Sequence, residues 1–393
     1  VVLNTNGTVS QVAESAVSES LGSESVFASL GIDDIAACYD STDDKVVILY
    51  AGSSGYLTGV VGTISGTGIS FGTPVVAFSE DTGDDGNDIA AVYDAGSGKV
   101  ICCFIQKSAK RGRYVVGEVS GISISFGSVS DFDANQCRFV GLAHDTTNSK
   151  FVVAYSSFSN SGYGQVRSGT LSGTTITWSS ASYFESASTE WVGAAFSPDV
   201  SRTIIGYRDQ GNSNQLTAVT VNCSGSTPSV GTPVVADSGS EARKTKVVYD
   251  TNVDRVIIIY TDSNSSNRAK VISGTPSASS ISFGSPVEIA TGYADTTGLA
   301  FDSVSNKVVA IYEDETAGNG YYAVVTTASN NVLSVATPVI FNSGNTAKMA
   351  VTGAIESKLA ICYVDQANSS YGTSRVLQLA ATSTNLTATN FLG

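Results

Sequence analysis

The sequence has few of the residues on which histidine-based catalysis and membrane insertion depend. Its 393 residues include one histidine and one methionine, and only 14% of them are charged. No stretch approaches the roughly 18 consecutive apolar residues that a membrane helix needs. The beginning, VVLNTNGTVS, has neither the basic region nor the apolar core of a signal peptide. It also lacks an initiating Met, so we expect a mature fragment or part of a longer, non-membrane polypeptide.

Positive charge is scarce as well. The chain has 21 basic against 35 acidic residues, a net charge of -14 and a pI near 4.4. Such a surface repels phosphate backbones and anionic lipid head groups. We therefore expect neither a nucleic acid partner nor membrane insertion.

The cysteines lack the spacing of a metal or disulfide framework. There are six of them, with no CxxC pair, and they fall at unrelated positions of the repeat described next. Cys102 and Cys103 are adjacent in an apolar run, where their side chains would point to opposite faces of a strand. We predict free, buried thiols that act as small apolar residues.

What the sequence does have is a sevenfold internal repeat. A basic residue opens an apolar run that closes on an aromatic residue five positions later. The seven runs are Lys45 to Tyr50, Lys99 to Phe104, Lys150 to Tyr155, Arg202 to Tyr207, Arg255 to Tyr260, Lys307 to Tyr312 and Lys358 to Tyr363. Successive basic residues are 54, 51, 52, 53, 52 and 51 positions apart. These intervals are near the blade length of propeller repeats, so one large repeat domain is predicted.

Each repeat contains four strand-length segments, seen best in residues 89–131. The runs IAAVYD and KVICCFI are apolar throughout, whereas RYVVGEVSG and SISFGSVSDF alternate. All four are rich in β-branched and aromatic residues, are bounded by turn residues and lack helical periodicity. We predict a four-stranded antiparallel meander with the two apolar strands innermost. Seven such sheets around an axis make an all-β, seven-bladed β-propeller.

The closing strands outnumber the blades by one. Residues 20–29 precede the first unit and residues 386–393 end the last, and both resemble closing strands. We expect residues 20–29 to complete the last blade by pairing with residues 373–381, and residues 1–12 to form a hairpin around Asn6-Gly7. The predicted divisions are an N-terminal hairpin and linker (1–19), the propeller (20–385), and a C-terminal strand or the start of a following segment (386–393).

The turn between the first two strands carries an aspartate five residues before the basic residue in five units. These residues are Asp40, Asp94, Asp145, Asp250 and Asp302. An aspartate that caps its own turn opposite a Lys or Arg is ordinary hairpin chemistry. We interpret this pattern as scaffold.

The loops between the second and third strands lie on the other face and vary between units. They are rich in Asn, Ser and Tyr, which suits hydrogen bonding and stacking on a carbohydrate or a protein, although solvated turns are the alternative. Function is expected to begin one or two residues after each second-strand aromatic. The candidate ligand-binding residues are Asp209, Asp262, Asp314, Asp365, Tyr163 and Tyr371. The four aspartates could form part of a ring that binds cations or sugar hydroxyls, or they could cap their own loops.

One connector, SEDTGDDGND (79–88), resembles a calcium-binding loop. Its candidate ligands are Asp81, Asp84, Asp85 and Asp88. The loop departs from the D-x-D-x-D-G pattern because Gly83 stands where a ligand belongs and no glutamate follows at the twelfth position. Calcium is the one cofactor that the sequence suggests.

Catalytic constellations are hard to find. A Ser-His-Asp triad would have to use His144, which falls where other units carry a tyrosine, so we interpret it as a strand-end filler. Propeller sialidases need an arginine cluster and S-x-D-x-G-x-x-W boxes, and no such box occurs. Six arginines are scattered through different units: Arg111, Arg113, Arg138, Arg167, Arg208 and Arg268. Paired carboxylates for a glycosidase stay open, because acidic residues are plentiful. We predict that the chain is not an enzyme.

Several stretches resemble the propeller repeats of tail-fibre and other virion surface proteins of bacteriophages. They are VVLNTNGTVS, AVYDAGSGKVI, GYRDQGN, SGYG, GTISGTGISFGTPVVAF and LTATNFLG. The resemblance implies a non-enzymatic appendage on the virion surface, present in several copies, that binds a host-surface glycan or protein through its loop face. One alternative is a structural spacer or docking domain that contacts other virion proteins. A second alternative is a polysaccharide-degrading enzyme.

Overall fold

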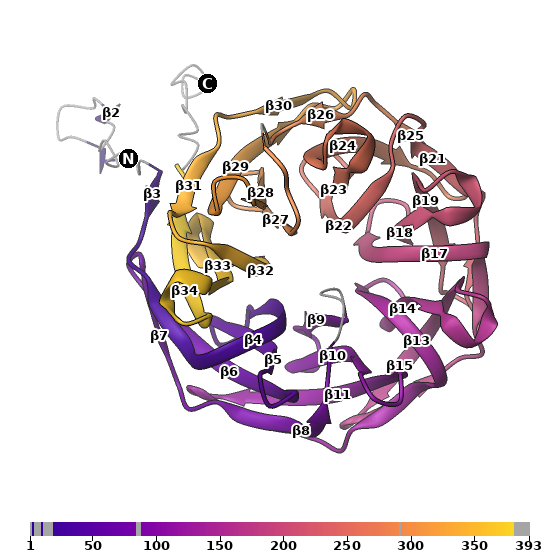
Figure 1. Ribbon diagram of the computed structural model, residues 1–393, viewed down its shortest axis with the longest axis horizontal. Coiled ribbons are helices and arrows are strands. Elements are labelled where there is room, and N and C mark those ends of the chain that lie inside the picture. The colour runs from indigo at the N-terminus through magenta and orange to yellow at the C-terminus, as the bar shows by residue number, and fades with distance from the viewer. Residues whose placement is uncertain (1, 4–8, 11–18, 84–87, 291, 381–393) are drawn as a thin grey trace.

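The strands form a closed ring of radial sheets around a central axis (Figure 1). This computed structural model describes residues 2–3, 9–10, 19–83, 88–290 and 292–380. Within these residues there is no α-helix, and no helix is long and apolar enough to cross a membrane. The prediction of an all-β propeller is confirmed.

Strand pairing divides the ring into seven antiparallel units within the described residues. The innermost strands are β4 (Ser25–Asp40), β9 (Ile89–Asp94), β13 (Ser130–Asp145), β17 (Ser182–Ser197), β22 (Ala242–Asp250), β27 (Thr297–Asp302) and β32 (Thr346–Gly353). The second strands are β5 (Lys45–Gly52), β10 (Lys99–Gln106), β14 (Lys150–Ser157), β18 (Arg202–Asp209), β23 (Arg255–Asp262), β28 (Lys307–Asp314) and β33 (Lys358–Asp365). Each second strand begins at the basic residue of the sequence repeat, which therefore marks a strand start in every unit.

The third strands have 8–10 residues, whereas the fourth position is shorter and more irregular. The third strands are β6 (Tyr56–Ser65), β11 (Arg111–Ser120), β15 (Tyr163–Ser172), β19 (Gln215–Asn222), β24 (Arg268–Pro276), β29 (Asn319–Thr327) and β34 (Tyr371–Gln378). The fourth position is split into short pieces: β7 (Gly68–Phe71), β8 (Val75–Asp81), β12 (Ser123–Phe126), β16 (Thr175–Trp178), β20 (Ser229–Val230), β21 (Val234–Asp237), β25 (Ile281–Phe283), β26 (Val287–Glu288), β30 (Leu333–Val335), β31 (Val339–Asn342) and β3 (Ser20–Leu21). Three innermost strands, β4, β13 and β17, also supply the outer part of the preceding unit, because each runs on for 16 residues.

The N-terminal segment supplies the fourth strand of the last unit. Strand β3 pairs with β34 through Ser20 and Leu21, and the beginning of β4 pairs with β34 between Ser25 and Gly31. Ahead of this segment, β1 (Val2–Leu3) pairs with β2 (Val9–Ser10) in antiparallel fashion. The predicted turn at Asn6-Gly7 and the segment 386–393 lie outside the described residues.

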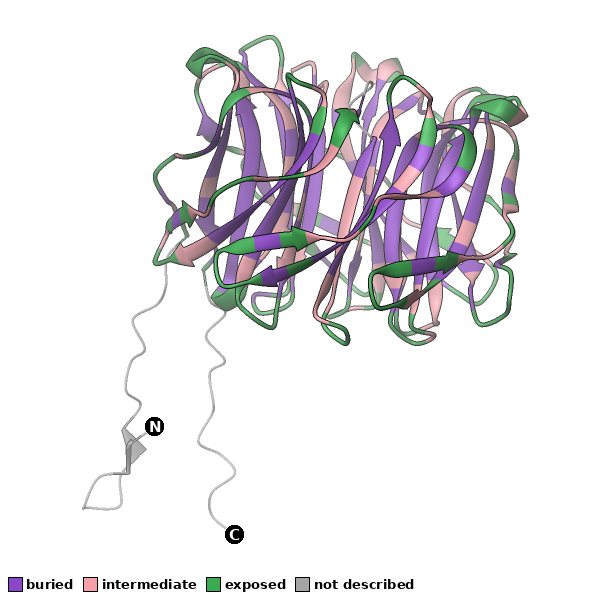
Figure 2. Cartoon of the chain, turned by 90° about the horizontal axis from the view of Figure 1, so that it is seen from below, coloured by how far each residue is buried: buried purple, intermediate pink, exposed green. Residues whose placement is uncertain are grey.

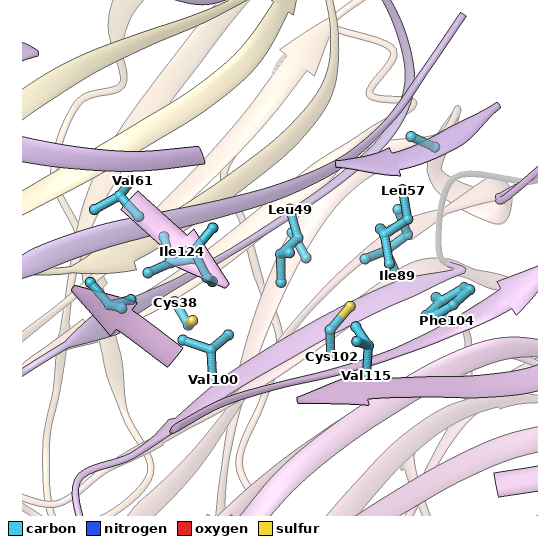
Figure 3. Close-up of a cluster of buried hydrophobic side chains, with 14 residues drawn as sticks. Cys38, Leu49, Leu57, Val61, Ile89, Val100, Cys102, Phe104, Val115 and Ile124 are labelled. Atoms are coloured by element: carbon cyan, nitrogen blue, oxygen red, sulfur yellow. The ribbon is translucent and has the colours of Figure 1, made fainter. Parts of the chain in front are cut away.

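The hydrophobic core lies between neighbouring units rather than in one central mass. Figure 3 shows one interface, where Leu49 and Val61 of the first unit face Val100 and Phe104 of the second. The described residues contain seven such clusters, one for each pair of neighbouring units. All six cysteines are buried and unbonded, and several of them pack in these clusters.

The burial of the strands does not decrease steadily from the axis outward, as we expected from the sequence. The second strands are buried along almost their whole length, as in β5, whereas innermost β9 is only half-buried because one of its edges faces the central channel. Figure 2 shows the buried strands crossing the molecule between two exposed faces. The face with the turns between first and second strands is called the hairpin face. The opposite one, with the loops between second and third strands and the connectors between units, is called the loop face.

On the hairpin face, the repeated aspartates cap their turns as interpreted from the sequence. The Asp145 carboxylate accepts hydrogen bonds from the Asn148 backbone N–H at 3.0 Å and from Asn148 Nδ2 at 2.9 Å. Asp40, Asp94, Asp250 and Asp302 accept from backbone N–H groups in the same way. These carboxylates stabilise the scaffold.

Four turns on the loop face share a second device. Each second strand there ends in a single turn of 3₁₀-helix: η1 (Phe158–Asn160), η2 (Gln210–Asn212), η3 (Ser263–Ser265) and η5 (Gln366–Asn368). A further turn, η4 (Ile355–Ser357), lies on the hairpin face between β32 and β33. The residue that follows η1, η2, η3 and η5 is a serine in the left-handed region, with φ between 57° and 59°.

Candidate functional site at the mouth of the central channel

One ring of equivalent positions on the inner wall of the channel carries small side chains with one exception. At the position opposite the residue before each second-strand aromatic, six units carry Ala or Gly: Ala36, Ala90, Gly141, Gly193, Gly298 and Ala350. The seventh unit carries Lys246, which pairs with Ile259. These residues line an axial cavity of about 150 Å³. A single ammonium group in a ring of small side chains indicates that this channel has a role beyond packing.

Above this ring, on the loop face, the innermost strands bulge. The pairing of these strands shifts register near Asp34, Phe139, Trp191, Lys244 and Lys348. The last four residues have left-handed backbones, with φ of 55°, 52°, 53° and 40°. Bulges of this kind redirect side chains and are frequent beside functional sites.

The bulges bring charged side chains together around the axis. We call the set Asp34, Lys244, Lys246, Thr296, Thr297 and Lys348 the channel mouth, because these residues line a common small hollow, of about 10 Å³, at the loop-face end of the channel. They come from four units, from β4, β22, β32 and the start of β27 with the residue before it, and the chain brings them together only by closing the ring (Figure 1).

Asp34 and Lys246 have opposite charges at this mouth. The Asp34 carboxylate accepts hydrogen bonds from the backbone N–H groups of Ile35 at 2.9 Å and Asp88 at 2.8 Å. Burial raises the pKa of Asp34, while the charges of Lys246 and Lys348 oppose the rise. Burial likewise lowers the pKa of Lys246, and Asp34 opposes that fall. Each group therefore favours the charged form of the other.

A buried carboxyl, Glu313, lies next to the mouth. It follows the second-strand aromatic Tyr312 directly and is only 8% exposed. Its Oε2 accepts a hydrogen bond from Thr296 Oγ1 at 3.1 Å. Burial raises the pKa of Glu313 to about 7, and the charges of Glu315 and Asp295 add to the rise. A carboxyl with this pKa can hold a proton at neutral pH and release it to a bound ligand.

A second carboxylate, Asp295, belongs to the same connector as Thr296. Its side chain is 41% exposed, and its Oδ2 lies 3.7 Å from Lys244 Nζ. Two backbone hydrogen bonds hold this connector against the loop after β28: Glu313 N–H donates to Thr296 O at 3.2 Å, and Glu315 N–H donates to Tyr293 O at 2.9 Å. The two segments that carry these carboxyl groups, one buried and one exposed, are thus held together by their backbones.

Aromatic and basic groups complete the surroundings. Lys244 Nζ lies 4.3 Å from the centroid of the Trp191 ring, within the range of a cation–π contact. Burial lowers the pKa of Lys244, and the charge of Asp295 opposes the change. The indole N–H of Trp191 is buried and has no hydrogen-bond partner among the described residues.

The six residues that the sequence suggested as ligand-binding do not gather at the mouth. Asp209, Asp262, Asp314 and Asp365 each accept hydrogen bonds from backbone N–H groups one turn later in their own loop. Loop capping, the alternative reading, therefore accounts for their carboxylates. Tyr163 contacts Tyr183 edge to face, with centroids 6.1 Å apart, and Tyr371 opens β34 opposite Gly31. Ligand binding by these six residues stays a prediction.

The calcium-like connector is described only in part. Asp84 and Asp85 lie outside the described residues. The Asp81 carboxylate accepts a hydrogen bond from the Ser108 N–H at 3.3 Å, and Asp88 accepts one from the Phe139 N–H at 3.1 Å. No group of three or more His, Cys, Asp or Glu side chains suited to a metal ion occurs in the described part of the chain.

His144 and the scattered arginines lie away from the mouth or are engaged in ion pairs. His144 stacks on Phe151 on the hairpin side, and burial lowers its pKa. Arg208, which directly follows a second-strand aromatic as Glu313 does, bridges Glu190 at 3.1 Å and Glu241 at 2.8 Å. Arg113, Arg167 and Arg268 form ion pairs with Asp131, Asp133 and Glu288. No arginine cluster is present among the described residues at the axis.

Sequence reasoning missed Glu313, Asp295 and the mouth lysines, although two signals were present. The residue after the second-strand aromatic is uncharged in five units: Ala51, Ile105, Ser156, Thr261 and Val364. Glu313 departs from that set, as Lys246 departs from the Ala and Gly of its own position. In both cases the signal is a charged residue at a position that is uncharged in most of the other units. The position of Glu313 lies one residue before the aspartates that cap the loops.

No protein-family model matches the chain, and no curated protein is significantly similar to it in sequence. Solved structures do match. The chain is similar to the NanB sialidase of Streptococcus pneumoniae, with 12% identity and a TM-score of 0.51, over 93% of this chain and 70% of that chain. It is also similar to the intramolecular trans-sialidase of Ruminococcus gnavus, with 8% identity and a TM-score of 0.51, over 90% of this chain and 96% of that chain. At such identities the likeness shows a shared fold.

These neighbours correct three expectations. The assignment to bacteriophage tail-fibre and virion surface proteins is wrong, because the structures that match are sialidases and trans-sialidases. The non-enzymatic attachment function that this assignment implied is contradicted by the same neighbours. The prediction that the chain is not an enzyme is contradicted as well.

Proposed function

We propose that this chain is a glycoside hydrolase whose reaction takes place at the channel mouth. The observation that carries the proposal is Glu313, a nearly buried carboxyl whose pKa is raised to about 7 beside a more exposed carboxylate, Asp295. Most glycosidases use a protonated carboxyl as general acid together with a second, ionised carboxylate. A carboxyl held protonated by burial is suited to the first role.

In this proposal Glu313 donates its proton to the glycosidic oxygen as the bond to the sugar carbon breaks. The leaving sugar departs as an alcohol, and Asp295 stabilises the positive charge that develops on the remaining ring. Water then adds its oxygen to that carbon, and its proton restores the Glu313 acid. Thr296 is a positioning residue, because its hydroxyl donates to Glu313 Oε2 and leaves the other carboxyl oxygen to carry the proton.

The lysines narrow the substrate class. Lys244, Lys246 and Lys348 gather at the mouth of a chain whose net charge is -14. Asp34 and Asp295 offset part of this charge, but three ammonium groups in a partly buried hollow still favour a sugar that bears a carboxylate or sulfate. The substrate in this proposal is therefore an acidic glycan.

The test is to incubate the full chain with a panel of acidic and neutral polysaccharides and to measure new reducing ends. We expect cleavage of an acidic glycan, with kcat/KM lower by about 10²- to 10⁴-fold in Glu313→Gln. Wild-type activity should fall as pH rises past about 7, because the general acid then loses its proton.

Glu118→Gln is the matched control, because Glu118 pairs with Lys99 near the hairpin face. It should cleave at the wild-type rate. Cleavage by Glu313→Gln at the wild-type rate would overturn the assignment of the acid, and a panel left intact by the wild-type chain would overturn the activity.

A further inference from the structure

Two hollows flank the η1 turn on the loop face of the third unit. One, with a volume of about 230 Å³, is lined by Arg138, Phe158, Ser188 and Glu190. The other, with a volume of about 340 Å³, is lined by Asp133, Asn160, Arg167 and Tyr183. Small-molecule sites typically enclose about 300–1,000 Å³, so the pair is of a size to hold a ligand.

The first hollow has an aromatic wall and a cation held in place. The Phe158 ring is 56% exposed. The Arg138 guanidinium carbon lies 5.9 Å from the Phe158 centroid and 5.2 Å from the Phe139 centroid, so the cation lies between two rings. Glu190, in the same hollow, is fixed by its ion pair with Arg208. An exposed phenyl ring beside fixed polar groups is costly to leave in water and is therefore a candidate contact surface.

The second hollow has the same combination. Tyr183 is 50% exposed, and its hydroxyl accepts a hydrogen bond from Asn160 Nδ2. The floor is polar and rigid: Arg167 pairs with Asp133 at 3.0 Å, and Tyr155 donates to the same carboxylate at 2.6 Å. Phe158, Tyr183 and Tyr56 are the strongly exposed aromatic residues among those described, and two of the three line these adjoining hollows.

Residues of the first hollow are sequence neighbours of residues at the channel wall and at the channel mouth. Phe139 lines this hollow and occupies the bulge position next to Val140 of the channel wall. Glu190 of the hollow immediately precedes Trp191, whose ring contacts Lys244 of the mouth. A chain-like ligand at the mouth can therefore extend across the first hollow toward the second.

From this arrangement we propose that the two hollows bind consecutive sugar units of a glycan chain whose end lies in the channel mouth. Pyranose rings have apolar C–H faces that pack on aromatic rings, and their hydroxyl rims hydrogen-bond with guanidinium, carboxylate and amide groups. Phe158 and Tyr183 supply the aromatic surfaces, while Arg138 and the Asp133–Arg167 pair supply the polar partners. The inference rests on the proposed glycan-processing function and adds that the substrate is a chain of several sugar units.

The test uses the full chain carrying Glu313→Gln, so that binding is measured without cleavage. The probe is a printed array of acidic and neutral oligosaccharides from one to six sugar units. We expect binding to strengthen with length, and Phe158→Ala or Tyr183→Ala to weaken binding of trisaccharides and longer probes by about tenfold. Monosaccharide binding should be unchanged by either substitution.

Two controls keep the result interpretable. Phe158→Tyr retains the ring and should retain binding, and Val304→Ala removes an exposed apolar side chain on the hairpin face and should have no effect. An array left empty, or length-dependent binding that the Phe158→Ala, Tyr183→Ala double variant preserves, would overturn the inference. Array binding without any cleavage by the wild-type chain would instead overturn only the proposed hydrolase function.

Discussion

The two faces of the propeller differ in how closely their residues follow the sequence repeat. On the hairpin face, the same carboxylate-capped turn recurs in five units, and its neighbours change little. On the loop face, the equivalent positions around the axis carry one acid, two aromatic residues and two bases, namely Asp34, Phe139, Trp191, Lys244 and Lys348. Seven similar units therefore carry an asymmetric site. Substitutions on the hairpin face should change stability, whereas substitutions at the site on the loop face should change activity.

The largest expected effect is on the loop face. Asp295→Asn removes the exposed carboxylate beside Lys244 and should lower kcat/KM by about 10²- to 10⁴-fold, with little change in melting temperature. The measurement is release of reducing ends together with thermal unfolding. Asp254→Asn, at a turn of the hairpin face, is the control and should leave kcat/KM unchanged. Retention of more than a tenth of wild-type activity in Asp295→Asn would contradict a catalytic carboxylate at this position.

Glu313 should also make stability depend on pH. Its pKa is raised from 4.5 to about 7 by folding, so the native state keeps a proton that the unfolded state has lost. The free energy of unfolding should therefore fall as pH rises from about 4.5 to 7, by about 3 kcal/mol at most, and level off above that. Urea unfolding of the wild type and Glu313→Gln at several pH values measures the difference. Parallel pH curves for the two proteins would contradict the raised pKa.

A scaffold change should affect stability alone. In β34, a Cβ added to Gly372 would lie 2.5 Å from the Phe27 ring and 2.4 Å from Ile32 Cδ1. The same close approach of glycine to phenylalanine occurs at Gly112, Gly164 and Gly320. We expect Gly372→Ala to destabilise the fold by about 1–3 kcal/mol in urea unfolding. Gly68→Ala, where the nearest atom is 3.5 Å away, is the control, and equal stability of the two variants would contradict the packing argument.

The smallest effect compares two capping aspartates, one from each face. Asp145 is fully buried, and Asp145→Ala would leave two donors of Asn148 without their acceptor, at a cost of about 1–2 kcal/mol. Asp314 caps an exposed turn, so Asp314→Ala should cost about 0.5 kcal/mol. Chemical denaturation of both variants measures the difference. A larger loss for Asp314→Ala would show that this loop contributes more to stability than its exposure indicates.

The repeat made the scaffold predictable because strand starts, turns and interface residues recur with the same period. Lys45 and its six counterparts each begin a second strand, and the aspartates ahead of them cap turns, since both depend on local backbone geometry. The site was not predictable in the same way. Lys244, Asp295 and Glu313 are up to 69 residues apart in the sequence, and only the packing of two neighbouring units, with the bulge at Lys244, brings them together.

The aspartates of the loops have two possible roles that the sequence alone does not separate. Aspartates two residues past an aromatic look like a ring of ligands, but a carboxylate at the end of a strand is also the nearest acceptor for the unpaired N–H groups of the following turn. Asp209 and Asp365 are engaged in this way. Glu313, one residue earlier, is still within its strand and accepts instead from the Thr296 side chain.

The way in which the ring is closed has a consequence during synthesis. The backbone of Gly22 accepts a hydrogen bond from Arg375, a residue 353 positions later, and the beginning of β4 has no outer-edge partner until β34 exists. The N-terminal segment that completes the last unit therefore stays without its strand partner until the last strand has been made. The ring is therefore completed late in folding. Only then does Asp34 of the first unit lie beside the lysines of the later units.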